Sequence, residues 1–348
     1  MTKLTLKNEP KINKERRNKM ENNNEKTKLN LPALKNKSGG ISVKSENKQL
    51  KAFDVKSMQK QSKIESILKK ESIKQEMYKQ QQLHTGLDLV LMGDFTDSMS
   101  QYRETLRRKF KELCAMLLKI IPNLRIGIIF YLDHGAKGTY YNPNYNPYVV
   151  KSHKLSVDIE SLANFIDSTP IGNGLDFDEA VEDALHEALN FNWNENNTRS
   201  IVLFGDARPH EPHECDKNYD YFSITELLYK RGTTINTVYC STDVDYRKLT
   251  SLYKVEIGDF NNRISRLDHP EFFSWIANVT GGVAIGVEQI DDIVDIIKAM
   301  AAKDAGKFEE LEEEVRKITT KPIPALEHIK KRAKEIESKK RLLQIDYK

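Results

Sequence analysis

From residue 87 onward, short apolar runs alternate with segments of helical periodicity, and this alternation constrains the fold more than any other feature. Strand-like runs occupy 87–93, 125–132, 200–205 and 233–240, with weaker ones at 147–155 and 283–287. Helical patterns occupy 100–121, 178–189, 223–232, 270–282 and 290–302. Apolar strands joined by helices are typical of βαβ units. The sequence therefore predicts an α/β fold: a doubly wound, mostly parallel, Rossmann-like sheet with helices on both faces.

Charge divides the chain into a basic arm and an acidic body. Residues 1–84 hold 21 Lys and Arg against 9 Asp and Glu, whereas the rest holds 34 against 42. Low apolar content predicts a disordered arm over 1–53. Residues 54–84 read as a polar helix or linker, with a weak apolar face suited to pairing as a coiled coil. We expect a globular domain over 85–302 and a charged helical C-terminal appendage over 303–348.

Several classes of protein are disfavoured by what the sequence lacks. It has no apolar h-region at its start and no apolar run of about 18 residues, so we expect neither a signal peptide nor a membrane span. The cysteines, Cys114, Cys215 and Cys240, are too sparse for a disulfide framework, which favours a reduced, cytoplasmic setting. The basic arm has only Phe53 and Tyr78 as aromatics, so nucleic-acid binding is disfavoured.

Side chains that offer oxygen ligands follow two of the predicted strands and precede one of the predicted helices. Asp94, Thr96 and Ser98 stand at alternate positions after the first strand, and Asp206 follows the fourth. Asp176 lies in a Gly-rich loop ahead of a helix. Each acid alone could cap a helix or belong to a turn, but ligands of open α/β sheets bind at the carboxyl ends of strands. Carboxylates that converge there favour a hard divalent cation.

Four short motifs in order resemble the von Willebrand factor A (vWA) domain with a metal-ion-dependent adhesion site (MIDAS). They are "DFTDSM" (94–99), "YLDH" (131–134), "GNGLDFDEAV" (172–181) and "DARPH" (206–210). The nearest variety is the intracellular subgroup linked to alpha-kinases, although no kinase motif occurs here. Asp97 and Arg208 stand where that subgroup has Gly and Pro, and Asn173 and Leu175 interrupt its Gly triplet.

The resemblance, which covers about 85–302, implies a function as well as a fold. A cation such as Mg²⁺, Mn²⁺ or Ca²⁺ would be held by Asp94, Thr96, Ser98 and Asp176, with Asp206 in support through water. An open coordination position would accept an Asp or Glu of a partner protein. The chain is then a non-catalytic protein–protein interaction module.

A Tyr-rich hairpin is the predicted partner-binding surface. In the strand order of the vWA family it opens beside the metal face, and tyrosines are enriched at binding hot spots. The residues are Tyr140, Tyr141, Tyr145 and Tyr148. Packing of some of these rings onto the body is the alternative.

Other functions stay open. A zinc hydrolase would use His210, His213 and Cys215 of "PHEPHEC", with a fourth ligand from distant Cys240 or His134. A phosphoryl-transfer enzyme would use Asp94 as nucleophile, but Thr96 occupies the place of the second acid that haloacid-dehalogenase-like enzymes require. A third alternative is an interaction platform that needs no cation. The sequence does not determine the oligomeric state.

Overall fold

A computed structural model describes residues 86–134, 146–241, 244–245, 247–261, 266–287, 289–320 and 322–345. The predicted arm (1–53), the linker (54–84) and Tyr140, Tyr141 and Tyr145 lie outside this part of the chain. The described strands form one six-stranded sheet of order β3-β2-β1-β4-β5-β6. Their bounds are β1 Gly86–Asp94, β2 Arg125–Tyr131, β3 Val150–Ser156, β4 Asn197–Gly205, β5 Thr233–Tyr239 and β6 Ala284–Gly286.

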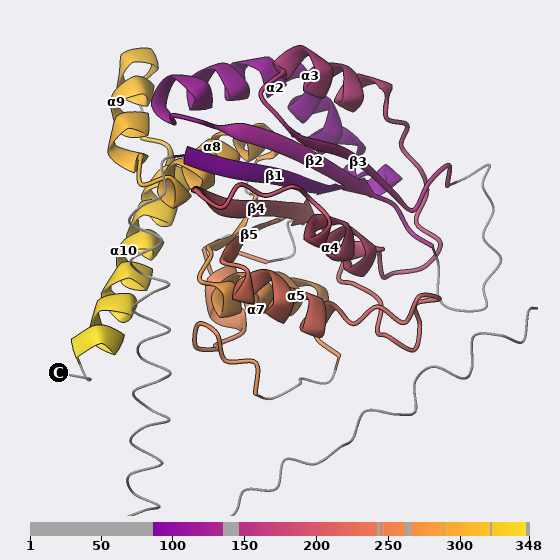
Figure 1. Cartoon of the computed structure of the whole chain (residues 1–348). Coiled ribbons are helices and arrows are strands. Elements are labelled where there is room, and N and C mark those ends of the chain that lie inside the picture. The colour runs from indigo at the N-terminus through magenta and orange to yellow at the C-terminus, as the bar shows by residue number, and fades with distance from the viewer. Residues whose placement is uncertain are drawn as a thin grey trace, which may run out of the picture. The chain divides into compact units, whose positions relative to one another are not determined.

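Helices cover both faces of this sheet (Figure 1). On one face lie α2 (Ser100–Ile120), α3 (Ile159–Ser168) and α8 (Ile293–Asp304), which share a buried cluster with Leu89 and Leu91 of β1. On the other lie α4 (Val181–Leu189), α5 (Tyr221–Lys230) and α7 (His269–Thr280), which pack with Val90 and Met92. Alternate residues of β1 thus enter opposite cores, and the predicted doubly wound α/β class is confirmed.

The pairing of the strands brings the motif-bearing loops to one edge. β1 runs parallel to β2 and β4, with Asp94 opposite Tyr131 and Gly93 opposite Phe204. The carboxyl ends of β1, β2 and β4 therefore lie side by side. β3 is antiparallel to β2 and forms one end of the sheet.

The helices differ from prediction in three places. The sequence pattern did not single out α3, whose N-cap Asp158 accepts a hydrogen bond from the Ser161 N–H. α4 begins at Val181 rather than 178. α5 begins at Tyr221, two residues before the predicted start, because Asp220 caps it through the Phe222 N–H.

The C-terminal segment consists of α9 (Phe308–Ile318) and α10 (Pro324–Ile345). Leu311, Ile329 and Ile336 are buried in the same cluster as α2 and α8, so these helices pack on the domain. Short α6 (Leu249–Leu252) and the 3-10 turns η2 (Asp97–Met99) and η3 (Ile290–Asp292) complete the fold. Among the described helices, none is both long and apolar enough to cross a bilayer.

Candidate functional site

The first predicted loop folds back on the end of β1. Asp94 Oδ1 accepts hydrogen bonds from the Thr96 N–H (2.8 Å) and the Thr96 hydroxyl (2.7 Å). The hydroxyl oxygens of Thr96 and Ser98 lie 3.2 Å apart. The Asp-x-Thr-x-Ser spacing thus collects three oxygen-bearing side chains at one point, of which Asp94 and Thr96 are buried and Ser98 is exposed.

Asp94 lies in an unfavourable electrostatic environment. Its Oδ2 is buried and accepts no hydrogen bond from the described residues. Burial, and then the charge of Asp206, raise the pKa of Asp94 from 3.8 to about 7. Gly205 makes room for this carboxylate, since a Cβ there would lie 3.2 Å from Asp94 Cβ and 2.7 Å from Tyr131 Oη. Asp94, at the end of β1, and Asp206, directly after β4, are therefore close enough for their charges to interact.

Glu179 is a third acid at this point, and the sequence analysis did not select it. Burial, and then the charges of Asp94, Asp133 and Asp206, raise the pKa of Glu179 to about 11. Its Oε2 is buried without a hydrogen-bond partner among the described residues. Glu179 precedes α4 and bridges Pro209, so its side chain points into the cluster instead of lying on a solvated helix face. Glu179 belongs to the motif "DEAV" (178–181), but in the sequence that motif is indistinguishable from the start of an ordinary helix.

Asp176 has a different environment from the one predicted. Its Oδ1 caps the Asp178 N–H at 2.8 Å and lies 3.5 Å from His210 Nε2. Its charge also contributes to the raised pKa of Glu179. Asp176 therefore borders the acidic cluster and is the most exposed contact of His210, with 31% of its side chain accessible. Its role as a metal ligand stays a prediction.

The Gly-rich loop is positioned by buried side chains outside it. Asp133 Oδ2 accepts hydrogen bonds from the backbone N–H groups of Leu175 and Asp176, the latter at 3.0 Å. Asn146 donates to the Asp133 carbonyl at 2.7 Å and accepts from the Asn173 N–H at 2.9 Å. Asp133 of the "YLDH" motif thus fixes the backbone of the loop.

Asp97 and Arg208, which depart from the vWA motif pattern, do not point into the acidic cluster of Asp94, Glu179 and Asp206. Asp97 is exposed at the start of the η2 turn. Arg208 is buried, and its guanidinium binds Asp178 and lies 3.7 Å from Glu211. The positive charge of Arg208 is therefore occupied by these two acids.

Of the predicted partner-binding tyrosines, only Tyr148 falls within the described residues. Its hydroxyl donates to the Pro170 carbonyl at 2.9 Å, and its ring packs against the core. Burial raises the pKa of Tyr148 above its usual range. For this residue the packing alternative fits the contacts. Tyr140, Tyr141 and Tyr145 stay predictions.

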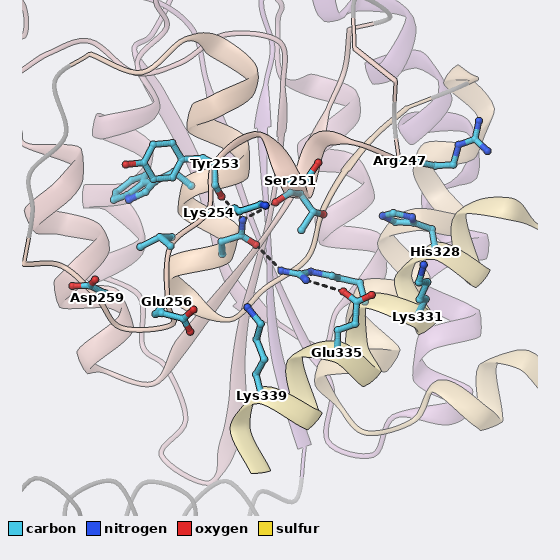
Figure 2. Close-up of a pocket in the computed structure, with 15 residues that line it drawn as sticks. Arg247, Ser251, Tyr253, Lys254, Glu256, Asp259, His328, Lys331, Glu335 and Lys339 are labelled. Atoms are coloured by element: carbon cyan, nitrogen blue, oxygen red, sulfur yellow. Dashed lines mark hydrogen bonds and ion pairs between the residues drawn. The ribbon is translucent and has the colours of Figure 1, made fainter. Parts of the chain in front are cut away.

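A separate pocket of about 590 Å³ lies between α6, α7 and α10 (Figure 2). Arg332 crosses it, donating to Asn278 Oδ1 at 3.0 Å and to Glu335 at 2.8 Å. Near Asn278, Thr280 of the last turn of α7 bonds to Ile235 at the start of β5. The pocket therefore lies near the amino end of β5, away from the acidic cluster.

Comparisons with known proteins give likeness at the level of the fold. Neither protein-family profiles nor curated proteins match the sequence. Among solved structures, BatB from Bacteroides thetaiotaomicron shares 15% identity over 64% of this chain and 100% of its own, with a TM-score of 0.40. The SpRpn10 VWA domain shares 11% over 61% and 94%, with a TM-score of 0.38. Proximal thread matrix protein 1 from the mussel byssus shares 14% over 64% and 47%, with a TM-score of 0.41. Such values carry no argument about function.

The sheet order, its antiparallel edge strand and the position of the four motifs at its carboxyl edge agree with the vWA-like α/β fold that the sequence resemblance predicts. Within that class, the affinity to the alpha-kinase-linked subgroup stays a prediction from the motifs.

Proposed function

We propose that this domain is a non-catalytic protein-interaction module that binds a divalent cation at the carboxyl edge of its sheet. Asp94, Thr96 and Ser98 hold the ion together with Asp206, and Glu179 lies beside it. Mg²⁺ is the preferred ion, since it takes one or two carboxylates and keeps several waters. A carboxylate of a partner protein then replaces one water.

The observation that carries this proposal is the pair of buried, unpartnered carboxylate oxygens, Asp94 Oδ2 and Glu179 Oε2. Buried like charges are strongly unfavourable unless they are protonated or share a counter-charge. The raised pKa values of Asp94 and Glu179 show this cost for the metal-free protein. A divalent cation would remove the cost, and hydroxyls of Thr96 and Ser98 add neutral oxygen ligands. The donor set therefore fits the ion that the fold family implies.

Isothermal titration of the full chain with Mg²⁺ and Mn²⁺ tests the cation. We expect one site, with affinity lowered at least tenfold in Asp94→Ala and Asp206→Asn. Glu256→Gln, an exposed acid at the remote pocket, is the matched control and should bind as the wild type does. Equal affinity in wild type and Asp94→Ala would refute the site.

Partner capture with and without EDTA separates this function from a cation-independent platform. The proposal predicts that capture is lost in EDTA and restored by Mg²⁺. A cytoplasmic setting is part of the same proposal, and the free, buried state of Cys114, Cys215 and Cys240 supports it.

A further inference from the structure

A second group of metal-ligating side chains lies beside the acidic cluster. It comprises His134 after β2, Glu182 and Asp183 in the first turn of α4, and Cys215 after β4. One ligand atom of each lies within 4.8 Å of the others. Glu182, Asp183 and Cys215 are buried, and His134 exposes 10% of its side chain.

The spacing of these atoms is close to that of a tetrahedral site. His134 Nε2 lies 2.7 Å from Glu182 Oε1 and 3.5 Å from Asp183 Oδ2, which lies 3.9 Å from Cys215 Sγ. Ligands at typical zinc distances of about 2.0 Å for nitrogen or oxygen and about 2.3 Å for sulfur lie roughly 3.3–3.6 Å apart. To bind zinc, the hydrogen-bonded His134–Glu182 pair must open by about half an ångström, and the Asp183–Cys215 pair must close slightly.

In each of the two carboxylates, the oxygen that points away from the group has a partner of its own. Glu182 Oε2 accepts a hydrogen bond from the backbone N–H of His210 at 3.2 Å. Asp183 Oδ1 binds the ammonium group of Lys217, a side chain that is 57% exposed. Glu182 Oε1 and Asp183 Oδ2 are thereby turned toward the centre of the group. Such outer contacts orient the ligands of protein metal sites.

His210 borders this group and is 1% exposed, and its Nε2 lies 3.5 Å from both Asp133 Oδ1 and Asp176 Oδ1. Its Nδ1 lies 3.3 Å from Glu182 Oε1, and its ring stacks on His134 with centroids 4.2 Å apart. Glu182 and Asp183 are adjacent buried carboxylates, and such a pair is costly unless positive charge lies among its oxygens, as a bound cation would provide.

We propose that His134, Glu182, Asp183 and Cys215 bind a zinc ion. Imidazole nitrogen, thiolate sulfur and carboxylate oxygen together suit borderline-soft Zn²⁺ better than Mg²⁺. Four protein ligands leave no open position, so the ion is structural and fixes α4 to the loops after β2 and β4. Binding displaces the proton of the Cys215 thiol. This site shares Cys215 and His134 with the zinc site considered from the sequence. It excludes His213, which is 81% exposed, and Cys240, which belongs to the opposite core.

Elemental analysis of the full chain, purified without chelator or affinity metal, tests the proposal. We expect about one zinc per chain, falling at least tenfold in His134→Ala and Cys215→Ser. The controls are His213→Ala and Cys114→Ser, a buried cysteine of the opposite core, and both should keep their zinc.

Cobalt substitution gives a readout that does not depend on purification history. Co²⁺ added to the metal-free chain should produce a thiolate-to-cobalt charge-transfer band, absent in Cys215→Ser and present in Cys114→Ser. If wild type gives no such band and no zinc, the group is an ion-pair network of Lys217 and His210 alone, and the proposal is wrong. Should Cys215→Ser fail to fold, the wild-type spectrum and zinc content still decide.

The zinc site does not rest on the Mg²⁺ proposal, and the two fail separately. Asp94→Ala should lose Mg²⁺ and keep zinc, whereas Cys215→Ser should lose zinc. Zinc that is lost equally in Asp94→Ala would place the ion in the acidic cluster and overturn the assignment.

Discussion

Asp94 links cation binding to pH. Its pKa in the folded, metal-free protein is about 7, above the ordinary value of 3.8. The stability that its protonated form contributes is full below pH 3.8 and is lost as the pH rises through 7. A cation must displace that proton below pH 7, whereas above it the carboxylate is already charged.

We therefore expect the Mg²⁺ affinity to rise about tenfold per pH unit up to pH 7 and then to level off. Titration calorimetry between pH 5.5 and 8.5, in buffers of different ionisation enthalpy, measures both the affinity and the protons released. An affinity that is flat across pH 6–7 would show that Asp94 is already ionised.

Glu179 offers a test in which a substitution should stabilise the metal-free protein. Because its pKa of about 11 keeps it protonated in the folded, metal-free chain, it must take up a proton on folding at neutral pH. Glu179→Gln replaces the protonated carboxyl by a group of the same shape. We expect the metal-free variant to unfold about 2–4 °C higher, corresponding to roughly 1 kcal/mol. A lower melting temperature in EDTA would contradict the protonated state.

The two glycines that end α7 have different roles. Gly281 takes the left-handed conformation (φ 77°) of a helix C-cap. At Gly282 a Cβ would lie 1.9 Å from the backbone oxygen of Ile235 in β5. The close approach of α7's end to the sheet therefore requires glycine at 282.

Gly282→Ala should lower the free energy of unfolding by about 1–3 kcal/mol or more, because backbone rather than a flexible side chain must move. Gly306→Ala is the comparison: its φ is 66°, but nothing lies within 4 Å of the added Cβ, so only a backbone strain of about 1 kcal/mol is expected. Urea unfolding of both variants measures the difference, and equal losses would show that the contact with Ile235 relaxes.

The strands were predictable from sequence because five of them are parallel and buried on both faces, which leaves continuous apolar runs. Helix α3 was overlooked, although its buried residues Leu162, Ala163 and Ile166 have helical spacing. Asp94, Thr96 and Asp206 were placed at the carboxyl edge of the sheet because each lies at or just after the end of an obvious strand, and their role as cation ligands stays a prediction. Glu179 was missed because only tertiary structure turns its side chain inward. Of the group around His134, the zinc alternative named His134 and Cys215, but it missed Glu182 and Asp183 because they lie in the first turn of a helix in a distant segment.

At the scale of the whole molecule, α10 makes the C-terminal segment part of the fold. Ile329 is fully buried, whereas Ile318 of α9 is 74% exposed. Ile329→Ala should cost about 2–5 kcal/mol in the unfolding of the whole domain, and Ile318→Ala less than about 0.5 kcal/mol. Thermal unfolding followed by tryptophan fluorescence reports on the sheet side through Trp275, which is buried beside α5. A transition unchanged in Ile329→Ala would mean that α10 unfolds independently.

Asp133 and Asn146 lie outside the Gly-rich loop that precedes α4, yet they hold its backbone through hydrogen bonds. Neither Asn173 nor Leu175 has positive φ, so neither of these positions demands glycine, whereas a Cβ at Gly174 would lie 2.9 Å from Glu179 Oε1. The loop can consequently change its side chains over evolutionary time while its path stays constant. Related proteins could acquire new binding preferences by drift at 173 and 175. A library randomised at these two positions, with Asp133, Asn146 and Gly174 kept, is a natural starting point for redirecting the domain to a chosen partner.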